Sequence, residues 1–407
     1  MKLWNIALRN ISRNKKRSIL SIISTAIATF SIVALFSYIE GMEKDMKNIA
    51  FNYDSGEILI RNSEFDDKIY SLEKSVSNYS KVLNILKKEM PYLELSPRLR
   101  FPSTVIKDDR TNICFGVAVD FTTEIKYLGL NSKIIEGEIP KNSRDVLMGI
   151  GLAEELGLKI GDKFTPITTT KKGASSGITF VVTGFAKFSS GAFTNKTFLV
   201  PLTEIPGILR MEGEISEILI KNVKEDLLNE ETKHINNILK NNNFNDIAAT
   251  PWTKIGLGAA MLKMADVSYS LMAIFFFILS STVIANTMLM VVFERKKEIG
   301  TLTAMGMTSL EVTRLFFIEA FYLGILGAFW GLILGIIIVL PLSYFGLDMS
   351  EMGENIDFGV SWIIYPQLSP KSTLLVFIYS VFVASFISFF PSKSASKVDP
   401  AVALRSI

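Results

Sequence analysis

Residue types able to carry out covalent or acid–base chemistry are scarce in this 407-residue chain. It holds one cysteine, Cys114, and one histidine, His234. A single cysteine excludes an intramolecular disulfide and a cysteine-based zinc cluster, and a single histidine disfavours histidine-based catalysis and histidine-rich metal sites. We expect Cys114 to be a buried small residue in the strand TNICFGVAVD and His234 to lie on a solvated helix surface.

Sequence motifs of nucleotide-binding and hydrolytic sites are absent as well. No G-x-x-x-x-G-K-[ST] loop occurs, so ATP binding of the Walker type is excluded for this sequence. GIGLAE and GLGAAM lack the third glycine of a dinucleotide fingerprint, and neither G-x-S-x-G nor H-E-x-x-H is present. We therefore predict a non-catalytic chain with no metal or cofactor of its own, and a membrane-anchored enzyme is disfavoured.

The most informative stretch of the sequence is 293–320, FERKKEIGTLTAMGMTSLEVTRLFFIEA. Apolar residues recur at helical spacing in its first half, at Ile299, Leu302 and Met305. Gly306 suits the left-handed position after a helix, and Thr308 with Glu311 forms a capping-box pattern before a second helix that begins at Ser309. One interpretation is a plain interfacial helix. The other is a lever that transmits force from a cytoplasmic motor.

Long apolar segments alternate with charged ones along the chain. Mean hydropathy is +0.33 with 20% charged residues, which indicates membrane spans joined to a soluble domain. Four apolar segments reach the length needed to cross a bilayer: 18–39, 267–293, 315–345 and 372–390. A cleaved secretory signal is the alternative for the first, but its apolar run continues past the cleavage-like Ala26-Ile27-Ala28. Glu319 is expected to snorkel to the membrane interface.

Charge asymmetry orients these four segments. Basic residues predominate in 1–17, 294–314 and 391–407, whereas the loop 346–371 is acidic. The positive-inside rule places both termini in the cytoplasm, and 346–371 and 40–266 outside. The net charge of +3 gives no indication of nucleic-acid binding.

The outside segment 40–266 mixes strand and helix patterns. Strands are expected at 58–60 and 111–120, and helices at 71–90 and 226–239. The predicted fold class is a membrane protein with four transmembrane α-helices and a large α+β extracytoplasmic domain between the first two. The polar stretch 168–177 within this domain reads either as a solvent-exposed hairpin tip or as a protruding partner contact.

Small residues are spaced for close helix contact in the third span. Gly327, Gly331 and Gly335 lie four residues apart, a spacing that lets helices approach closely in lipid. The spacing leaves open whether that contact lies within the chain or between two chains.

Several of these stretches together resemble the MacB/FtsX-like permeases of ABC transporters, and among them the LolC/LolE-type subunits. The N-terminal ALRNISRNKKR and the stretch 293–335 carry the resemblance, and VLMGIGLAEELGLKIGDKF and VVTGFAKFSSGAF look like the family's MacB-like periplasmic core domain. The C-terminus is similar to the family's ending at Pro391, Ala395, Asp399, Pro400, Ala403, Leu404 and Arg405.

The resemblance implies a permease subunit of the bacterial inner membrane that works with a separate cytoplasmic ATPase, which binds ATP and Mg. A second permease subunit, identical or related, would complete the dimer. ATP hydrolysis would move the periplasmic domain without cargo crossing the bilayer. The residues implied to couple to the ATPase are Glu298, Ile299, Gly300, Leu302, Ala304, Met305 and Gly306.

The resemblance to LolC/LolE-type subunits further implies a lipoprotein substrate and a periplasmic lipoprotein carrier. The corresponding carrier-contact loop residues are Pro166, Thr168, Thr169, Thr170, Lys171 and Lys172. The residues implied to face lipid or substrate are Ile32, Leu35, Phe36, Ile39, Met261, Met264, Leu271 and Phe275. A MacB-like efflux permease for peptides, toxins or drugs and an FtsX-like regulator of a cell-wall hydrolase are the alternatives.

Overall fold

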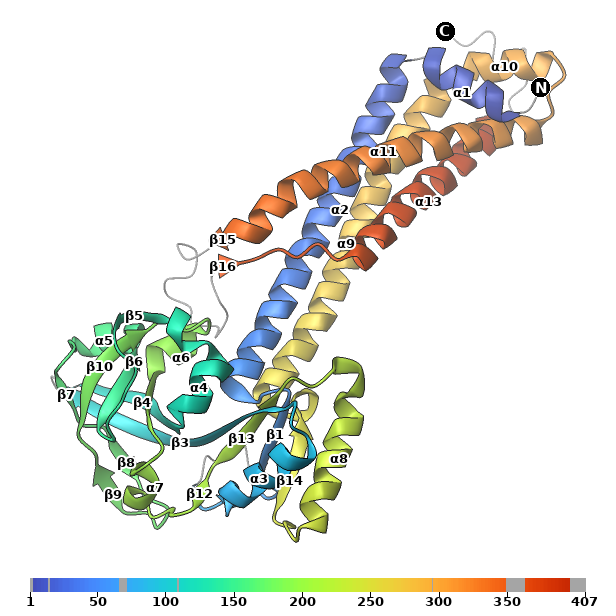
Figure 1. Ribbon diagram of the computed structural model, residues 1–407. Coiled ribbons are helices and arrows are strands. Elements are labelled where there is room, and N and C mark those ends of the chain that lie inside the picture. The colour runs from blue at the N-terminus through green and yellow to red at the C-terminus, as the bar shows by residue number, and fades with distance from the viewer. Residues whose placement is uncertain are drawn as a thin grey trace. The chain divides into compact units, whose positions relative to one another are not determined.

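The computed structural model describes residues 3–13, 15–65, 72–107, 110–294, 296–348 and 363–395 (Figure 1). The chain divides into two compact units. The first is built from Met1–Lys44, Ala265–Met349 and Ile363–Ile407, and the second from Asp45–Met264 with Ser350–Trp362. Each unit is described by itself.

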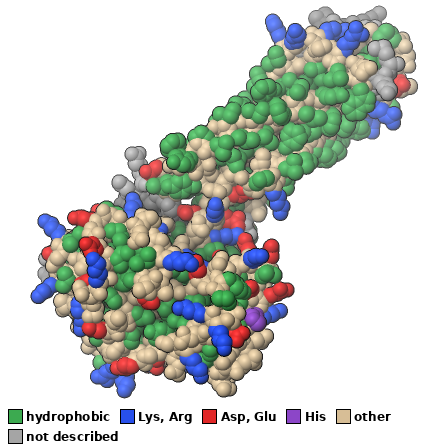
Figure 2. Space-filling view, in the orientation of Figure 1, with side chains coloured by type: hydrophobic (Ala, Val, Ile, Leu, Met, Phe, Trp, Pro, Cys, Tyr) green, Lys and Arg blue, Asp and Glu red, His purple; other side chains and the backbone are tan. Residues whose placement is uncertain are grey.

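Helices make up the first unit. They are α1 (Leu3–Arg13), most of α2 (Lys15–Ile49), most of α9 (Gly256–Glu294), α10 (Lys296–Ala304), α11 (Ser309–Phe345) and α13 (Pro370–Ala395). Two short strands, β15 (Leu347–Asp348) and β16 (Ile363–Ile364), pair antiparallel. Figure 2 shows apolar side chains along these helices, with Lys and Arg side chains gathered at the end where Figure 1 labels α1 and α10.

Three helices among the described residues are long and apolar enough to cross a membrane: Ser18–Asp54, Ser309–Phe345 and Pro370–Phe390. The expected second span, 267–293, lies in α9, where the described apolar stretch is the shorter Val267–Leu279. Glu319 does not snorkel as expected. Its side chain is 4% exposed, because α11 buries that face within the helical unit.

Aromatic and hydroxyl side chains join the helices of this unit. The rings of Phe277 and Tyr379 lie 4.1 Å apart between α9 and α13, and the hydroxyls of Ser281 and Tyr379 are hydrogen-bonded at 2.7 Å. Helix α1 contacts α11 in a similar way: Trp4 packs edge-on against Tyr322, with 5.7 Å between the ring centroids. In an apolar environment without water, such hydrogen bonds between helices satisfy the polar side chains and stabilise helix association.

A mixed β-sheet forms the centre of the second unit. Its main strand order is β14-β1-β13-β3-β4-β11-β6-β10-β5. These strands are β1 (Ile58–Asn62), β3 (Glu94–Lys107), β4 (Arg110–Val119), β5 (Ile134–Gly137), β6 (Asp145–Gly149), β10 (Phe180–Ala186), β11 (Thr197–Pro201), β13 (Glu217–Lys221) and β14 (Ile247–Pro251). The short strands β7 (Lys163–Phe164), β8 (Ile167–Thr169) and β9 (Ser175–Gly177) join its margin, and β2 (Val76–Ser77) pairs with β12 (Glu214–Ile215) separately.

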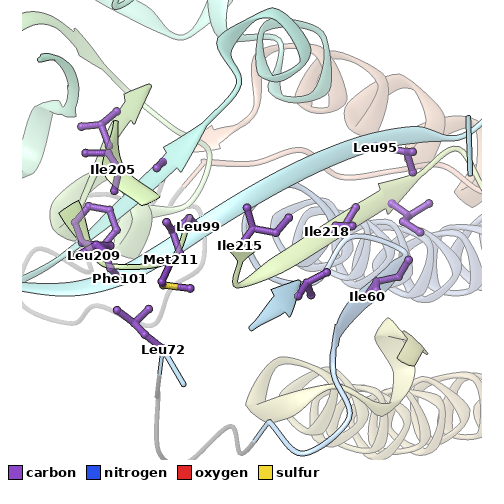
Figure 3. Close-up of a cluster of buried hydrophobic side chains, with 14 of the residues drawn as sticks. Ile60, Leu72, Leu95, Leu99, Phe101, Ile205, Leu209, Met211, Ile215 and Ile218 are labelled. Atoms are coloured by element: carbon purple, nitrogen blue, oxygen red, sulfur yellow. The ribbon is translucent and has the colours of Figure 1, made fainter. Parts of the chain in front are cut away.

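An apolar core covers each face of the sheet. Successive residues of a strand point to opposite faces, so neighbouring residues enter different cores. Ile58 and Ile60 enter one apolar core, and Leu59 between them enters the other. The first core, seen in part in Figure 3, includes side chains of α3 (Tyr79–Glu89), α5 (Ile150–Leu156), α7 (Ile205–Ile208) and α8 (Leu228–Asn241). The second includes side chains of α4 (Phe121–Leu128) and α6 (Gly191–Lys196).

Several sequence predictions for this unit are confirmed. The strand at 58–60 is part of β1, the strand at 111–120 is β4, and the helix at 226–239 is α8. His234 is exposed on α8. Cys114 is fully buried, and burial, helped by the charge of Glu155, raises the pKa of its thiol to about 12.

The helix expected at 71–90 is shorter than predicted. Helix α3 begins at Tyr79, and its first turn is preceded by Val76 and Ser77 in strand β2. Asn78 between them adopts a left-handed conformation with φ +53°, a region that asparagine tolerates better than most residues. Residue 71 lies outside the described part of the chain.

Candidate functional site

The predicted elbow between two helices forms the first part of the site. Helix α10 ends at Ala304, and Gly306 follows with φ +96°. The capping box is confirmed: Thr308 Oγ1 accepts the main-chain N–H of Glu311 at 3.4 Å, and Glu311 Oε2 accepts that of Thr308 at 2.9 Å. These bonds satisfy donors that the first turn of α11 would otherwise leave open.

One face of α10 is packed inward. Ile299 is 2% exposed and contacts Val312 and Phe316 of α11, and Gly300 is buried as well. These two residues of the predicted coupling set therefore do not lie on the surface. Ile299 is on the face of α10 that packs against α11.

The opposite face of α10 is open. Met305 is 70% exposed, Ala304 and Gly306 are exposed, and the Glu298 side chain is 38% exposed. Leu302 is half-buried. This face offers an apolar side chain at the point where the helix ends, together with one carboxylate, to any protein that docks there.

Helix α1 adds a second wall beside that face. A groove of about 760 Å³ lies between the two helices, and its lining residues are Ile6, Arg9, Asn10, Ser12, Arg13, Glu298, Thr301, Leu302 and Met305. Arg13 and Glu298 approach to 4.0 Å across it. The basic residues of 1–17 indicated only a charged flank, and this helix was not predicted from them. Trp4, Leu8 and Ile11 at helical spacing were the available signal.

The hairpin at 165–177 belongs to the second unit and is folded back onto it. Strands β8 and β9 pair antiparallel, which confirms the predicted hairpin. Thr168 donates a hydrogen bond to the carbonyl of Pro102 at 2.8 Å, and Lys171 forms an ion pair with Glu214. The main-chain N–H of Lys171 also donates to the Leu209 carbonyl at 3.0 Å.

Half of the predicted carrier-contact loop is consequently inaccessible. Pro166, Thr168 and Thr170 are buried, and Lys171 is partly buried. Only Thr169 and Lys172 of that set are exposed. The loop is a docked hairpin rather than a long projection.

The predicted lipid-facing residues separate into two groups. Ile32 and Ile39 are 1% and 9% exposed, so they do not face outward. Ile32 packs against Val376 of α13, which covers this face of α2. The remaining predicted residues are placed as follows: Leu35 and Phe36 are partly exposed, Met264, Leu271 and Phe275 are 58–71% exposed, and the side chain of Met261 lies outside the described set.

The glycines of α11 lie against α2 of the same chain. A Cβ atom at Gly327 would lie 2.5 Å from Thr25 Cβ, and one at Gly331 would lie 2.4 Å from the Ala26 carbonyl oxygen. At Gly335 a Cβ would meet Val33 at 2.8 Å. Only glycine permits this approach of the two helices, so the contact is within the chain.

Helix α2 ends in the second unit in a π-helical turn, Ala50–Asp54. Three consecutive carbonyls of this turn accept side-chain hydrogen bonds. Tyr127 Oη donates to Phe51 O at 3.0 Å, Arg98 Nη2 donates to Asn52 O at 2.8 Å, and Arg100 Nη2 donates to Tyr53 O at 2.8 Å. Cations at a helix C-terminus also complement its dipole.

Buried charges hold these donors in place. Arg98 and Glu124 form an ion pair at 2.5 Å with both side chains 1% exposed. Lys221 donates to the carbonyl of Tyr127 at 2.8 Å and lies 3.9 Å from the Tyr127 ring centroid. Burial raises the pKa of Tyr127 well above its ordinary value, which keeps its hydroxyl a donor. Sequence patterns did not predict this network, because its members are distant in sequence.

No cluster of metal-ligating side chains occurs in the part of the chain that the structure describes. Three features stand out among the described residues: an exposed face at the end of α10, the close contact of α11 with α2, and the hydrogen bonds that join the end of α2 to the sheet of the second unit.

Comparison with known proteins gives two family matches. Residues 18–234 match the MacB-like periplasmic core domain, and residues 270–400 match the FtsX-like permease C-terminal. Over its whole length the chain is 21% identical to the lipoprotein-releasing system transmembrane protein LolC of Neisseria meningitidis serogroup B, covering 99% of it.

Other similarities are more local. The chain is 31% identical over 122 residues to an uncharacterized ABC transporter permease of Methanocaldococcus jannaschii. That match covers 30% of this chain and 28% of the relative, so the chain spans less than a third of that protein. The periplasmic region of MacB from Actinobacillus actinomycetemcomitans aligns with 51% of this chain and 94% of its own, at 14% identity and a TM-score of 0.36.

Proposed function

The chain belongs to the MacB/FtsX-like permeases of ABC transporters, and from this premise we propose that it couples ATP hydrolysis in a separate cytoplasmic subunit to movement of its extracytoplasmic domain. The observation that carries the proposal is the bonding of the last turn of α2. Three side chains of the domain hold Phe51, Asn52 and Tyr53 by their carbonyls. A helix held this way passes its displacement to the sheet.

The ATPase docks on the exposed face of α10 in this proposal. Ala304, Met305 and Gly306 form the contact with Glu298 beside them, and the basic side of the α1 groove extends it. Ile299, buried against α11, passes the movement of α10 into that helix.

The proposed topology has four membrane-spanning helices in the bacterial inner membrane, with both termini cytoplasmic. The three apolar helices and the Lys and Arg side chains at one end of the unit support it. The α+β domain then lies outside the cytoplasm. A second permease subunit, identical or related, completes the transporter.

The cargo we propose is a lipoprotein extracted from the inner membrane. The end-to-end match to a lipoprotein-releasing protein supports this cargo. Leu271 and Phe275 are exposed on the part of α9 that belongs to the helical unit and supply an apolar surface for acyl chains. If a periplasmic carrier binds this subunit through the hairpin, it does so at Thr169 and Lys172.

Affinity purification of the tagged chain from native membranes, followed by mass spectrometry, tests the proposal. A cytoplasmic ABC ATPase, a related permease and acylated lipoproteins in the eluate are the expected result. Recovery of an adaptor with an outer-membrane channel would replace lipoprotein release with efflux of peptides, toxins or drugs. Recovery of a cell-wall hydrolase would replace it with the regulatory role.

A further inference from the structure

A groove at the end of the helical unit where Lys and Arg side chains gather combines an apolar wall with two cations. It lies between the first turns of α11 and the last turns of α13 and has a volume of about 450 Å³. Its lining residues are Ser309, Leu310, Thr313, Arg314, Phe317, Phe389 and Lys393. None of these residues belongs to the α10 face or to the α1 groove.

The apolar wall of this groove is open to its surroundings. Leu310 is 59% exposed, and Phe317 and Phe389 are each 38% exposed. A patch of three large, exposed apolar side chains indicates a surface that binds an apolar ligand or partner. Because the groove lies on two membrane-spanning helices, lipid is the molecule available to cover it.

The charges at the groove are positive. Arg314 and Lys393 are both exposed, and the Lys393 amine lies 5.9 Å from the centroid of the Phe389 ring. The nearest acid in sequence, Glu311, is held in the capping box by two hydrogen bonds from Thr308. A guanidinium and an ammonium beside an apolar wall match a phosphate joined to acyl chains.

The other end of the same two helices provides an internal contrast. A second groove there has a volume of about 350 Å³ and contains no charged lining residue. Its lining residues are Leu332, Ile336, Leu368, Pro370, Thr373, Leu374 and Phe377. Apolar grooves thus occur at both ends of the helix pair, but cations line only the groove at the end assigned to the cytoplasm.

We propose that the groove between α11 and α13 binds an anionic phospholipid of the cytoplasmic leaflet. Arg314 and Lys393 contact its phosphate, and Leu310, Phe317 and Phe389 contact its acyl chains. The cytoplasmic leaflet is the negatively charged one, and basic pockets between membrane helices on that side favour its head groups. The inference rests on the proposed orientation and is independent of the cargo and of the ATPase.

Native mass spectrometry of the full chain released from nanodiscs tests the proposal. The nanodiscs contain equal parts of phosphatidylglycerol and phosphatidylcholine, and the retained lipids are counted. The wild type is expected to retain phosphatidylglycerol at least fivefold over phosphatidylcholine. Combining Arg314→Ala with Lys393→Ala is expected to abolish this preference, whereas Arg314→Lys with Lys393→Arg keeps it.

The matched control is Lys371→Ala, which removes an exposed cation from the opposite end of α13 and is expected to leave the preference unchanged. Thermal unfolding in phosphatidylcholine alone checks that the double alanine variant is folded. If that variant is unfolded, the charge-preserving pair and single substitutions carry the test.

Three outcomes would overturn the proposal. The first is equal phosphatidylglycerol retention by the wild type and a folded double alanine variant. The second is loss of the lipid when millimolar inorganic phosphate is added, which would indicate a site for free phosphate. The third is a change in the dimer fraction without a change in lipid retention, which would indicate that a second copy of the chain covers the groove.

Discussion

The guanidinium of Arg98 donates a hydrogen bond from Nη2 to the main-chain carbonyl of Asn52 at 2.8 Å. The same nitrogen lies 2.5 Å from Glu124 Oε1. Arg98 is in β3, Glu124 is in α4, and Asn52 is in the turn that ends α2. One side chain therefore joins the end of α2 to a central strand and a covering helix of the second unit.

Arg98→Ala is expected to be strongly destabilising. It leaves the Glu124 carboxylate buried without its cation, a change that costs about 3–5 kcal/mol. Thermal unfolding of the full chain in detergent measures the effect. Arg144→Ala is the matched control, because its ion pair with Glu204 is 46% and 49% exposed, and such pairs contribute about 0–1 kcal/mol. Equal effects of the two variants would contradict the role assigned to Arg98.

The free energy of unfolding is expected to rise with pH between about 8 and ~10.4 because of Lys221. Burial, with a further contribution from the Arg98 charge, lowers the pKa of Lys221 to about 8, whereas an unfolded lysine titrates near ~10.4. Between these values the unfolded chain binds more protons, so stability increases as pH rises through that window. Below pH ~8 both states are protonated, and Lys221 contributes no pH dependence.

Thermal unfolding at pH 7.5 and 9.5 measures this contribution. Lys221→Met is expected to lose part of the rise seen in the wild type. Lys172→Met, which changes an exposed residue, is expected to keep it. A rise of the same size in all three proteins would assign the pH dependence to other groups.

Met305→Glu is expected to uncouple the ATPase without unfolding the permease. The Met305 side chain is 70% exposed, so the change costs little in the isolated chain, whereas a docking partner would have to bury the new carboxylate. Stimulation of ATPase activity by the reconstituted permease is expected to fall at least tenfold, with the Tm nearly unchanged.

A buried residue of α10, the helix that ends just before Met305, gives the comparison. Ile299→Ala removes apolar contacts with Val312 and Phe316 and is expected to lower stability by about 2–5 kcal/mol. Normal ATPase stimulation by Met305→Glu would remove the docking surface proposed for α10.

Gly331→Ala is expected to separate α11 from α2. The added Cβ would lie 2.4 Å from the Ala26 carbonyl oxygen and 2.7 Å from Thr29 Cβ, and overpacking of this kind costs about 1–3 kcal/mol. Gly207→Ala, where no atom lies within 4 Å of the new Cβ, is the control for thermal unfolding. A Tm unchanged in Gly331→Ala would show that the helices do not approach as closely as described.

Local patterns were sufficient to predict the elbow. Gly306, Thr308 and Glu311 lie within six residues, and each has a conformational or hydrogen-bonding role set by neighbours in sequence. Similarly, the apolar strands of the domain are recognisable because alternation and turn residues are local. The exposed face of α10 is set by the contact between α10 and α11. The sequence pattern of α10 alone therefore could not predict which face is exposed.

Strand β3 shows why other features were missed. It is the longest strand described, yet Pro97 and Pro102 interrupt its sequence, and proline usually indicates an edge strand or no strand. Nevertheless it pairs with β13 on one side and β4 on the other. Arg98, between the two prolines, gains its role only when β3, α4 and the end of α2 meet in the folded chain.

The burial of Cys114 has a practical consequence for following motion in this permease. The one native thiol is fully enclosed and holds its proton near neutral pH, and the thiolate is the form that reacts with labelling reagents. A cysteine introduced at an exposed position can therefore carry a spin label or fluorophore on an otherwise silent background. Pairs of such labels would report distance changes during ATP turnover without removal of any native residue.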